Sequence, residues 1–92
     1  MYILKSLPQA DKDIEAHKKS GNKAVINKIK EILQQLKLHP RTGIGKPEQL
    51  KYGPFAGYWS RHINDKDRII YDIRDSEIIV IVISAKGHYD DH

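Results

Sequence analysis

The longest regular pattern of apolar positions in the chain predicts an amphipathic helix that begins near Asn22. Apolar residues form one stripe of this helix, and lysines and glutamines fill its other face. The stripe consists of Val25, Ile29, Ile32, Leu33 and Leu36. The helix is expected to end at His39, because the residue before a proline is driven out of the helical conformation and Pro40 follows directly.

A second, weaker helix is predicted before it. Residues 2–6 alternate as in a short strand, and Pro8, which suits the first turn of a helix, then begins a helix that runs to about Lys19. One side of this helix carries Ala10, Ile14 and His17. Since residues 20–22 give only a short break, the two helices are expected to form a hairpin.

The second half of the chain reads as strands. They are expected at residues 49–52, 58–63, 68–74 and 77–84. Strands that follow one another through short turns must be antiparallel, and the unbroken apolar run in the last one is typical of a strand buried on both faces. The order β-α-α-β-β-β-β predicts an α+β fold in which the helical hairpin packs on one face of a mostly antiparallel, twisted sheet and leaves the other face open.

Composition limits the classes of function. A chain of 92 residues is expected to form a single domain over residues 1–92. Without cysteine it has no disulfide, thiolate zinc site or cysteine nucleophile, and its histidines lack metal-ligand spacing, so no metal and no cofactor are expected. The first residues do not resemble a signal peptide, and the longest apolar run, 78–83, is too short to cross a bilayer. A cytoplasmic protein without a membrane partner is the simplest interpretation.

Charge points weakly to a polyanionic partner. The formal net charge is +4 and the sequence pI is about 9.3. The distribution of the charges says more, because residues 41–62 contain only one acid, Glu48. The basic and histidine residues of this segment are Arg41, Lys46, Lys51, Arg61 and His62.

Several side chains could carry chemistry, and each also has a purely structural interpretation. Glu48, among lysines, could act as a general base or as a salt-bridge partner. Arg61, beside Trp59, is expected at the edge of the core with its guanidinium reaching a phosphate. Arg68 is expected on the open face of the sheet, where a cross-strand ion pair is the simpler role. His88, near the end of the chain, is by itself more typical of an exposed histidine. The glycine-rich segment 43–48 does not match a nucleotide-binding loop, and a tight crossing loop is expected there.

Taken together, four separated motifs resemble the YoeB (Txe) family of toxins within the RelE superfamily. The motifs lie at residues 45–51, 57–64, 68–71 and 87–89. The resemblance implies a RelE-like fold and a catalytic set of Glu48, Arg68 and His88. It also implies RNA contacts by Lys46, Lys51, Arg61 and Tyr89. At position 62, where members of the family often have a second arginine, this chain has a histidine.

The resemblance also implies an activity and partners. The family cleaves mRNA in the ribosomal A site through attack by the RNA 2′-hydroxyl, without a metal. A cognate antitoxin of the YefM or Axe kind would neutralise the toxin and carry the contacts to operator DNA, and a homodimer is possible. Two alternatives stay open: a relative of the ParE branch that binds gyrase, and a module of the same fold that binds its antitoxin or nucleic acid without cleaving.

Overall fold

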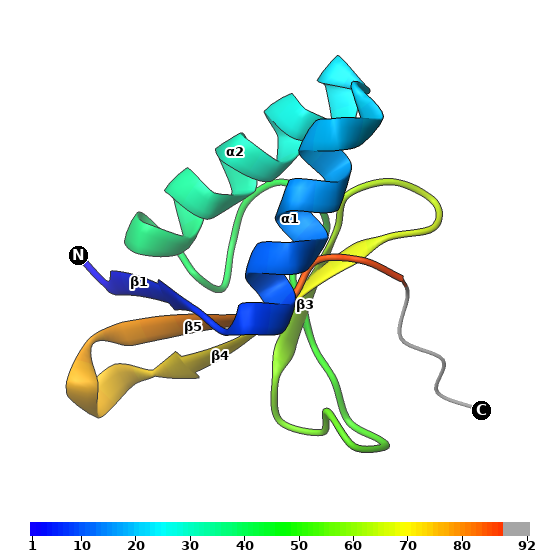
Figure 1. Cartoon of the computed structure of the whole chain (residues 1–92). Helices are drawn as coiled ribbons and strands as arrows, with labels where there is room; N and C mark the ends of the chain where they lie inside the picture. The colour runs from blue at the N-terminus through cyan, green and yellow to red at the C-terminus, as the bar shows by residue number, and fades with distance from the viewer. Residues whose placement is uncertain (88–92) are drawn as a thin grey trace.

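The computed structural model describes residues 1–87, and these form two layers (Figure 1). Helices α1 (Pro8–Ser20) and α2 (Lys23–Leu38) lie side by side on one face of a five-stranded sheet. The predicted α+β fold with a helical hairpin on one face of the sheet is therefore confirmed.

Local chemistry explains the two helices. Pro8 occupies the first turn of α1, and Gly21 ends the helix in the left-handed conformation, with φ of 74°. Asn22 then caps α2 by accepting a hydrogen bond from the backbone nitrogen of Val25 at 3.2 Å. The predicted stripe of α2 is buried at Val25, Ile29, Ile32 and Leu36. This stripe and Ala10 of α1 belong to one buried core between the helices and the sheet.

The sheet has the order β1-β5-β4-β3-β2. Its strands are β1 (Ile3–Ser6), β2 (Glu48–Gln49), β3 (Trp59–His62), β4 (Arg68–Arg74) and β5 (Ile79–Ser84). Only β1, which pairs with β5, runs parallel to its neighbour, and the other pairs are antiparallel, as predicted. A single 3₁₀ turn, η1 (Asp75–Glu77), joins β4 to β5.

Two strand predictions need correction. The strand expected at 49–52 is β2, which covers only Glu48–Gln49. In the strand expected at 77–84, Val80 and Val82 are buried, but Ile79, Ile81 and Ile83 are only partly buried, so one face alone is fully covered. The cause is that the helices cover one face of the sheet, and β-branched residues on the other face keep the strand conformation without being fully buried.

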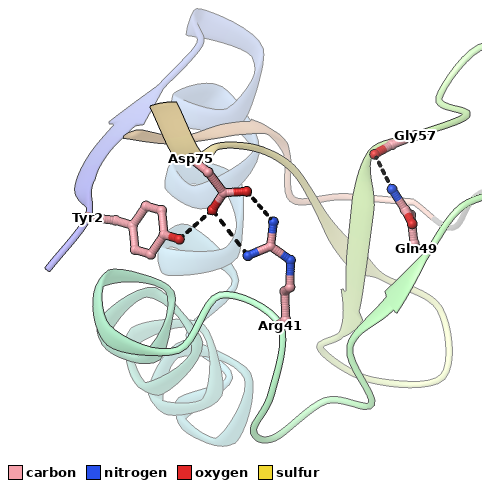
Figure 2. Close-up of polar contacts among 5 residues, drawn as sticks. All are labelled: Tyr2, Arg41, Gln49, Gly57 and Asp75. Carbon is pink, nitrogen blue, oxygen red and sulfur yellow. Dashed lines mark hydrogen bonds and ion pairs between the residues drawn. The ribbon is translucent and has the colours of Figure 1, made fainter. Parts of the chain in front are cut away.

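A polar cluster ties the start of β1 to the turn after β4. Asp75 accepts hydrogen bonds from the Tyr2 hydroxyl and from both terminal nitrogens of Arg41 (Figure 2). The hydrogen bonds from Arg41 and then from Tyr2 hold the pKa of the Asp75 carboxyl below its usual value. Arg41 therefore has a structural partner and is not a free cation of the basic segment.

Candidate active site

The register of the sheet brings three site residues onto the face that the helices leave open. Glu48 pairs with Ser60, and His62 pairs with Arg68. Because side chains alternate along a strand, Glu48, His62 and Arg68 project from the same face, while Trp59 and Arg61 project toward the helices. The sequence prediction that Arg68 lies on the open face is confirmed.

Glu48 and Arg68 form an ion pair but no close hydrogen bond. The Arg68 Nη1 lies 3.6 Å from the Glu48 Oε1, which is beyond hydrogen-bonding distance. The Glu48 side chain is 58% exposed and the Arg68 side chain 22% exposed. Within residues 1–87 no acceptor binds the Arg68 Nε, although that atom is buried. The pair thus joins an accessible carboxylate to a guanidinium whose Nε has no acceptor in the described part of the chain.

His62 is the third member of this group, and sequence reasoning treated it only as a difference from the family. Its side chain is partly buried, and burial, followed by the charge of Arg68, lowers its pKa below 6.5. Lys46 and Lys28 lower the pKa further, while Glu48 opposes them. His62 is therefore expected to be neutral near pH 7. The cross-strand register with Arg68 is the signal that would have placed it in the site.

An open polar depression of about 430 Å³ adjoins His62. It is lined by Lys28, Gly45, Lys46, His62, Asn64 and Asp65. Lys28 comes from the polar face of α2, to which the sequence analysis assigned no role in the site. The depression extends the candidate site from the sheet to the helical layer and makes its entrance mainly basic.

The loop before β2 passes close to β3 and presents Lys46. The Gly45 oxygen accepts a hydrogen bond from the His62 nitrogen at 2.7 Å. A Cβ atom at Gly45 would lie 2.8 Å from the His62 oxygen, and Gly45 has φ of +81°, so both space and backbone conformation favour glycine there. The expected tight crossing loop is confirmed. Lys46 and Lys51 are exposed and able to meet a ligand.

Arg61 requires a correction. Its side chain was expected to reach a phosphate, but the residue is 0% exposed and its guanidinium points into the fold. It donates to the Tyr71 hydroxyl and to the Gln35 side chain at 3.1 and 2.7 Å. It also donates to the backbone oxygens of His39, Thr42 and Ile44. Arg61 thus holds the end of α2 and the following loop against β3.

Two predicted site residues, His88 and Tyr89, lie outside the described residues. The chain immediately before them is held at the site, since the Arg68 nitrogen donates a hydrogen bond to the Gly87 oxygen at 2.9 Å. Among residues 1–87, no group of three or more histidine and acidic side chains is arranged to hold a metal ion. In the same part of the chain, neither helix is long and apolar enough to cross a membrane.

Comparison with known proteins identifies the family. The family model described as "YoeB-like toxin of bacterial type II toxin-antitoxin system" matches residues 8–89. The chain belongs to the YoeB family of toxins. The YoeB toxin of Synechocystis is 38% identical over 69 residues, which cover 75% of this chain and 77% of that protein.

Solved YoeB structures agree with the architecture. A YoeB/ParE toxin from Agrobacterium tumefaciens is 34% identical, with a TM-score of 0.84 over 97% of this chain and 100% of that one. A YoeB–YefM complex from Staphylococcus aureus contains a chain that is 34% identical, with a TM-score of 0.76 over 97% of this chain and 99% of that one. The range matched by the family model, residues 8–89, spans Glu48, Arg68, His88 and Tyr89.

Proposed function

We propose that this YoeB toxin is an endoribonuclease that cleaves mRNA on the ribosome, at the A site. The observation that carries the proposal is the pair of Glu48 and Arg68, side by side on the open face, with the carboxylate accessible and, within residues 1–87, no acceptor for the Arg68 Nε. A buried donor without a partner costs about 1–3 kcal/mol. A phosphate that approaches Arg68 would supply the missing acceptors.

The proposed reaction needs a base, an acid and a group that neutralises charge. Glu48 takes the proton of the RNA 2′-hydroxyl, and the 2′-oxygen forms a bond to the neighbouring phosphorus. The bond from phosphorus to the 5′-oxygen breaks, and His88 gives that oxygen a proton. The products are a 2′,3′-cyclic phosphate and a free 5′-hydroxyl. Each proton transfer contributes typically ~10²–10⁴-fold in rate.

Arg68 serves this reaction in two ways. In the resting protein it balances the charge of Glu48 across 3.6 Å. When a phosphate binds, the guanidinium can turn its donors to the phosphate oxygens and stabilise the charge that develops on them. All these steps use protein groups, and we propose that cleavage needs no metal.

Four further residues are proposed to hold the RNA. Lys46 and Lys51 are exposed and would contact backbone phosphates. Tyr89 would stack on a base, as unpaired RNA bases do on aromatic rings. His62, beside Arg68, would donate to a phosphate oxygen when it is protonated. Arg61 is not included, because its donors are used inside the fold.

We also propose a cognate antitoxin of the YefM kind. Its support is the YoeB–YefM complex of Staphylococcus aureus, whose toxin chain is similar to this one along nearly its whole length. An acidic or amphipathic segment of the antitoxin would cover the open face and its lysines and would compete with RNA. Contacts with operator DNA would come through the antitoxin, and the toxin could form a homodimer.

The activity is tested by the end groups and the rates of single-turnover cleavage. Wild-type protein should cut ribosome-bound mRNA and leave a 2′,3′-cyclic phosphate and a 5′-hydroxyl. Glu48→Gln and His88→Gln should each reduce the rate by at least about 100-fold, whereas Glu77→Gln, an exposed glutamate in η1, should cut normally. If a folded wild-type protein binds its antitoxin but cuts nothing, the chain is a binding module. If the cut instead leaves a 3′-hydroxyl and a 5′-phosphate, the proposed attack by the 2′-hydroxyl is wrong.

A further inference from the structure

Helix α1 buries two polar side chains that the proposed reaction does not use. Asp13 is 7% exposed and His17 is 8% exposed. They lie one helical turn apart, so they share a face of α1. Burial of a carboxylate is costly unless hydrogen bonds compensate it. Within residues 1–87, Asp13 has no ion pair at salt-bridge distance.

Both side chains bind the backbone of the same residue, Ala85, which follows β5 directly. The Ala85 nitrogen donates a hydrogen bond to the Asp13 Oδ2 at 3.0 Å. The His17 Nε2 lies 2.7 Å from the Ala85 oxygen, and because a carbonyl only accepts, the histidine donates. Gln9 donates to the other oxygen of Asp13 at 2.8 Å. Asp13 and His17 therefore form a clamp on both backbone polar groups of one residue, Ala85.

The clamp acts where the chain leaves the sheet. Beyond Ala85, the Gly87 nitrogen donates to the Asp67 Oδ1 at 2.7 Å. The Gly87 oxygen accepts from the backbone nitrogen of Arg68 at 2.9 Å. Residues 85–87 are thus bound to α1 on one side and to the start of β4 on the other. They end beside Arg68, and His88 is the next residue in the sequence.

A role in stability alone does not explain the choice of residues. Replacing buried charged groups by well-packed apolar ones is often neutral or stabilising in proteins. An apolar face on α1 would also cover β5, as it does at Ala10. What an apolar face cannot do is bind the N–H and the C=O of Ala85 in a fixed direction. The hydrogen bonds define where the chain after β5 points.

We infer that Asp13 and His17 are positioning residues: by clamping the backbone of Ala85, they set the path of the chain from β5 past Arg68 to the proposed general acid, His88. This inference rests on the proposed function. Catalytic groups must be held closely, and a misplacement of about 1 Å can cost ~100-fold in rate. The clamp acts on placement of the acid and not on the lysines that bind RNA, so it governs the rate of the bound complex.

The test uses removal and rescue at both positions in the full chain. Asp13→Ala and His17→Leu each remove one hydrogen bond to Ala85. Asp13→Asn keeps an oxygen for the Ala85 nitrogen, and His17→Gln keeps an N–H for the Ala85 oxygen. Ile32→Val, in the core of α2, is the control for reduced stability without loss of a polar contact. Single-turnover cleavage of ribosome-bound mRNA is measured at saturating substrate and as a function of substrate concentration.

The expected result separates positioning from folding. Asp13→Ala and His17→Leu should each cut at a saturating rate about 10- to 100-fold lower, with the half-saturating concentration nearly unchanged. Asp13→Asn and His17→Gln should recover most of that rate, and Ile32→Val should cut like wild type. The Ala85 amide hydrogen should exchange faster in Asp13→Ala than in wild type, and it should stay protected in Asp13→Asn.

Other outcomes overturn the inference. If wild type cuts, Glu48→Gln does not, and the clamp variants cut at the wild-type rate while folded, the clamp does not position the acid. If Ile32→Val loses as much cleavage rate as Asp13→Ala at a similar loss of thermal stability, the role of Asp13 is structural. If wild type itself cuts nothing, the proposed function fails, and unchanged Ala85 exchange in Asp13→Ala would separately disprove the clamp.

Discussion

At the scale of single residues, two arginines on neighbouring strands have opposite roles. Arg61 is 0% exposed and uses its donors on neutral oxygens of the protein. Arg68 is 22% exposed at its side chain, and among residues 1–87 its ion-pair partner is Glu48, at 3.6 Å. The first therefore stabilises the fold, and the second is available to a ligand.

Substitution of Arg61 by lysine should test this difference. Lysine cannot reproduce the fork of donors, so several buried oxygens would lose their partner, at about 1–3 kcal/mol each. We expect Arg61→Lys to lower the free energy of unfolding by about 3 kcal/mol or more in urea titrations. Arg41→Lys, at an exposed ion pair, should cost about 1 kcal/mol or less. Equal effects of the two variants would contradict the structural role of Arg61.

His62 should make the protein sensitive to mildly acidic pH. Its pKa is lowered in the folded protein, so the unfolded chain binds the proton more readily. The contribution of His62 to stability is therefore fully present above about pH 6.5 and decreases as pH falls toward the folded-state pKa. We expect wild type to lose more unfolding free energy than His62→Gln as the pH is lowered from 7.5 to 5. A constant difference would contradict this.

The same residue should affect RNA affinity in the opposite direction. A phosphate beside His62 favours its protonated form, so RNA should bind more tightly as pH falls below about 6.5. His62→Arg carries a permanent charge and should bind more tightly at pH 7.5, without this pH dependence. Binding of a non-cleavable 2′-O-methyl RNA measures both effects. Parallel pH curves for the two proteins would exclude a contact between His62 and RNA.

At this scale the sequence predicted the position of Arg68 correctly, whereas the catalytic roles of Glu48, Arg68 and His88 stay predictions. Glu48 and Arg68 lie in short motifs whose order and spacing resemble a known family, and strand alternation placed Arg68 on the open face. The burial of Arg61 could not be predicted, because its partners Gln35 and Thr42 come from other elements and include backbone oxygens. The clamp on Ala85 was likewise hidden, since Asp13 and His17 meet it only in the folded chain.

At the scale of elements, the loop before β2 fixes the geometry of the site. It passes so close to β3 that a side chain at Gly45 would meet the His62 oxygen at 2.8 Å. The sequence indicated a tight crossing loop, and the helices and most strand limits also followed from periodicity and from proline, glycine and asparagine signals. The length of β2 did not, because a two-residue strand has no periodicity.

Gly45→Ala should disturb both stability and site. The substitution adds strain at a positive φ, at about 1–2 kcal/mol, and a close contact with β3. We expect a loss of about 2 kcal/mol or more in unfolding free energy and a slower cleavage, since Lys46 and His62 flank the contact. Gly57→Ala has a similar φ of +92° but open space around it, so it should show the strain alone. Similar losses in both variants would disprove the close-contact argument.

At the scale of the whole molecule, the small net charge of +4 is less informative than its distribution. Among the basic residues of segment 41–62, Arg41 and Arg61 have structural partners, which leaves the exposed Lys46 and Lys51 and the depression beside His62 available to a ligand. RNA and an acidic antitoxin segment would therefore meet the same surface. The predicted neutralisation is a direct competition between the two.

The salt dependence of RNA affinity should indicate how many lysines contact phosphates. Each such contact contributes about 0.7 to the slope of log affinity against log salt for single-stranded RNA. The double variant Lys46→Gln and Lys51→Gln should lower this slope by roughly 1.4. A matched double variant on α1, Lys12→Gln and Lys19→Gln, should leave it unchanged. Equal slopes for both double variants would place the RNA on another surface.

The most direct measurement of the central claim is the position of the cut on programmed ribosomes. Purified wild type and Glu48→Gln are added to ribosomes stalled at a defined codon, and the mRNA ends are mapped by primer extension. We expect a cut within the A-site codon with wild type, and none with Glu48→Gln at equal folded concentration. A cut of equal strength with both proteins, or none with a folded wild type, would contradict the assignment of Glu48 as the base of a ribosome-dependent ribonuclease.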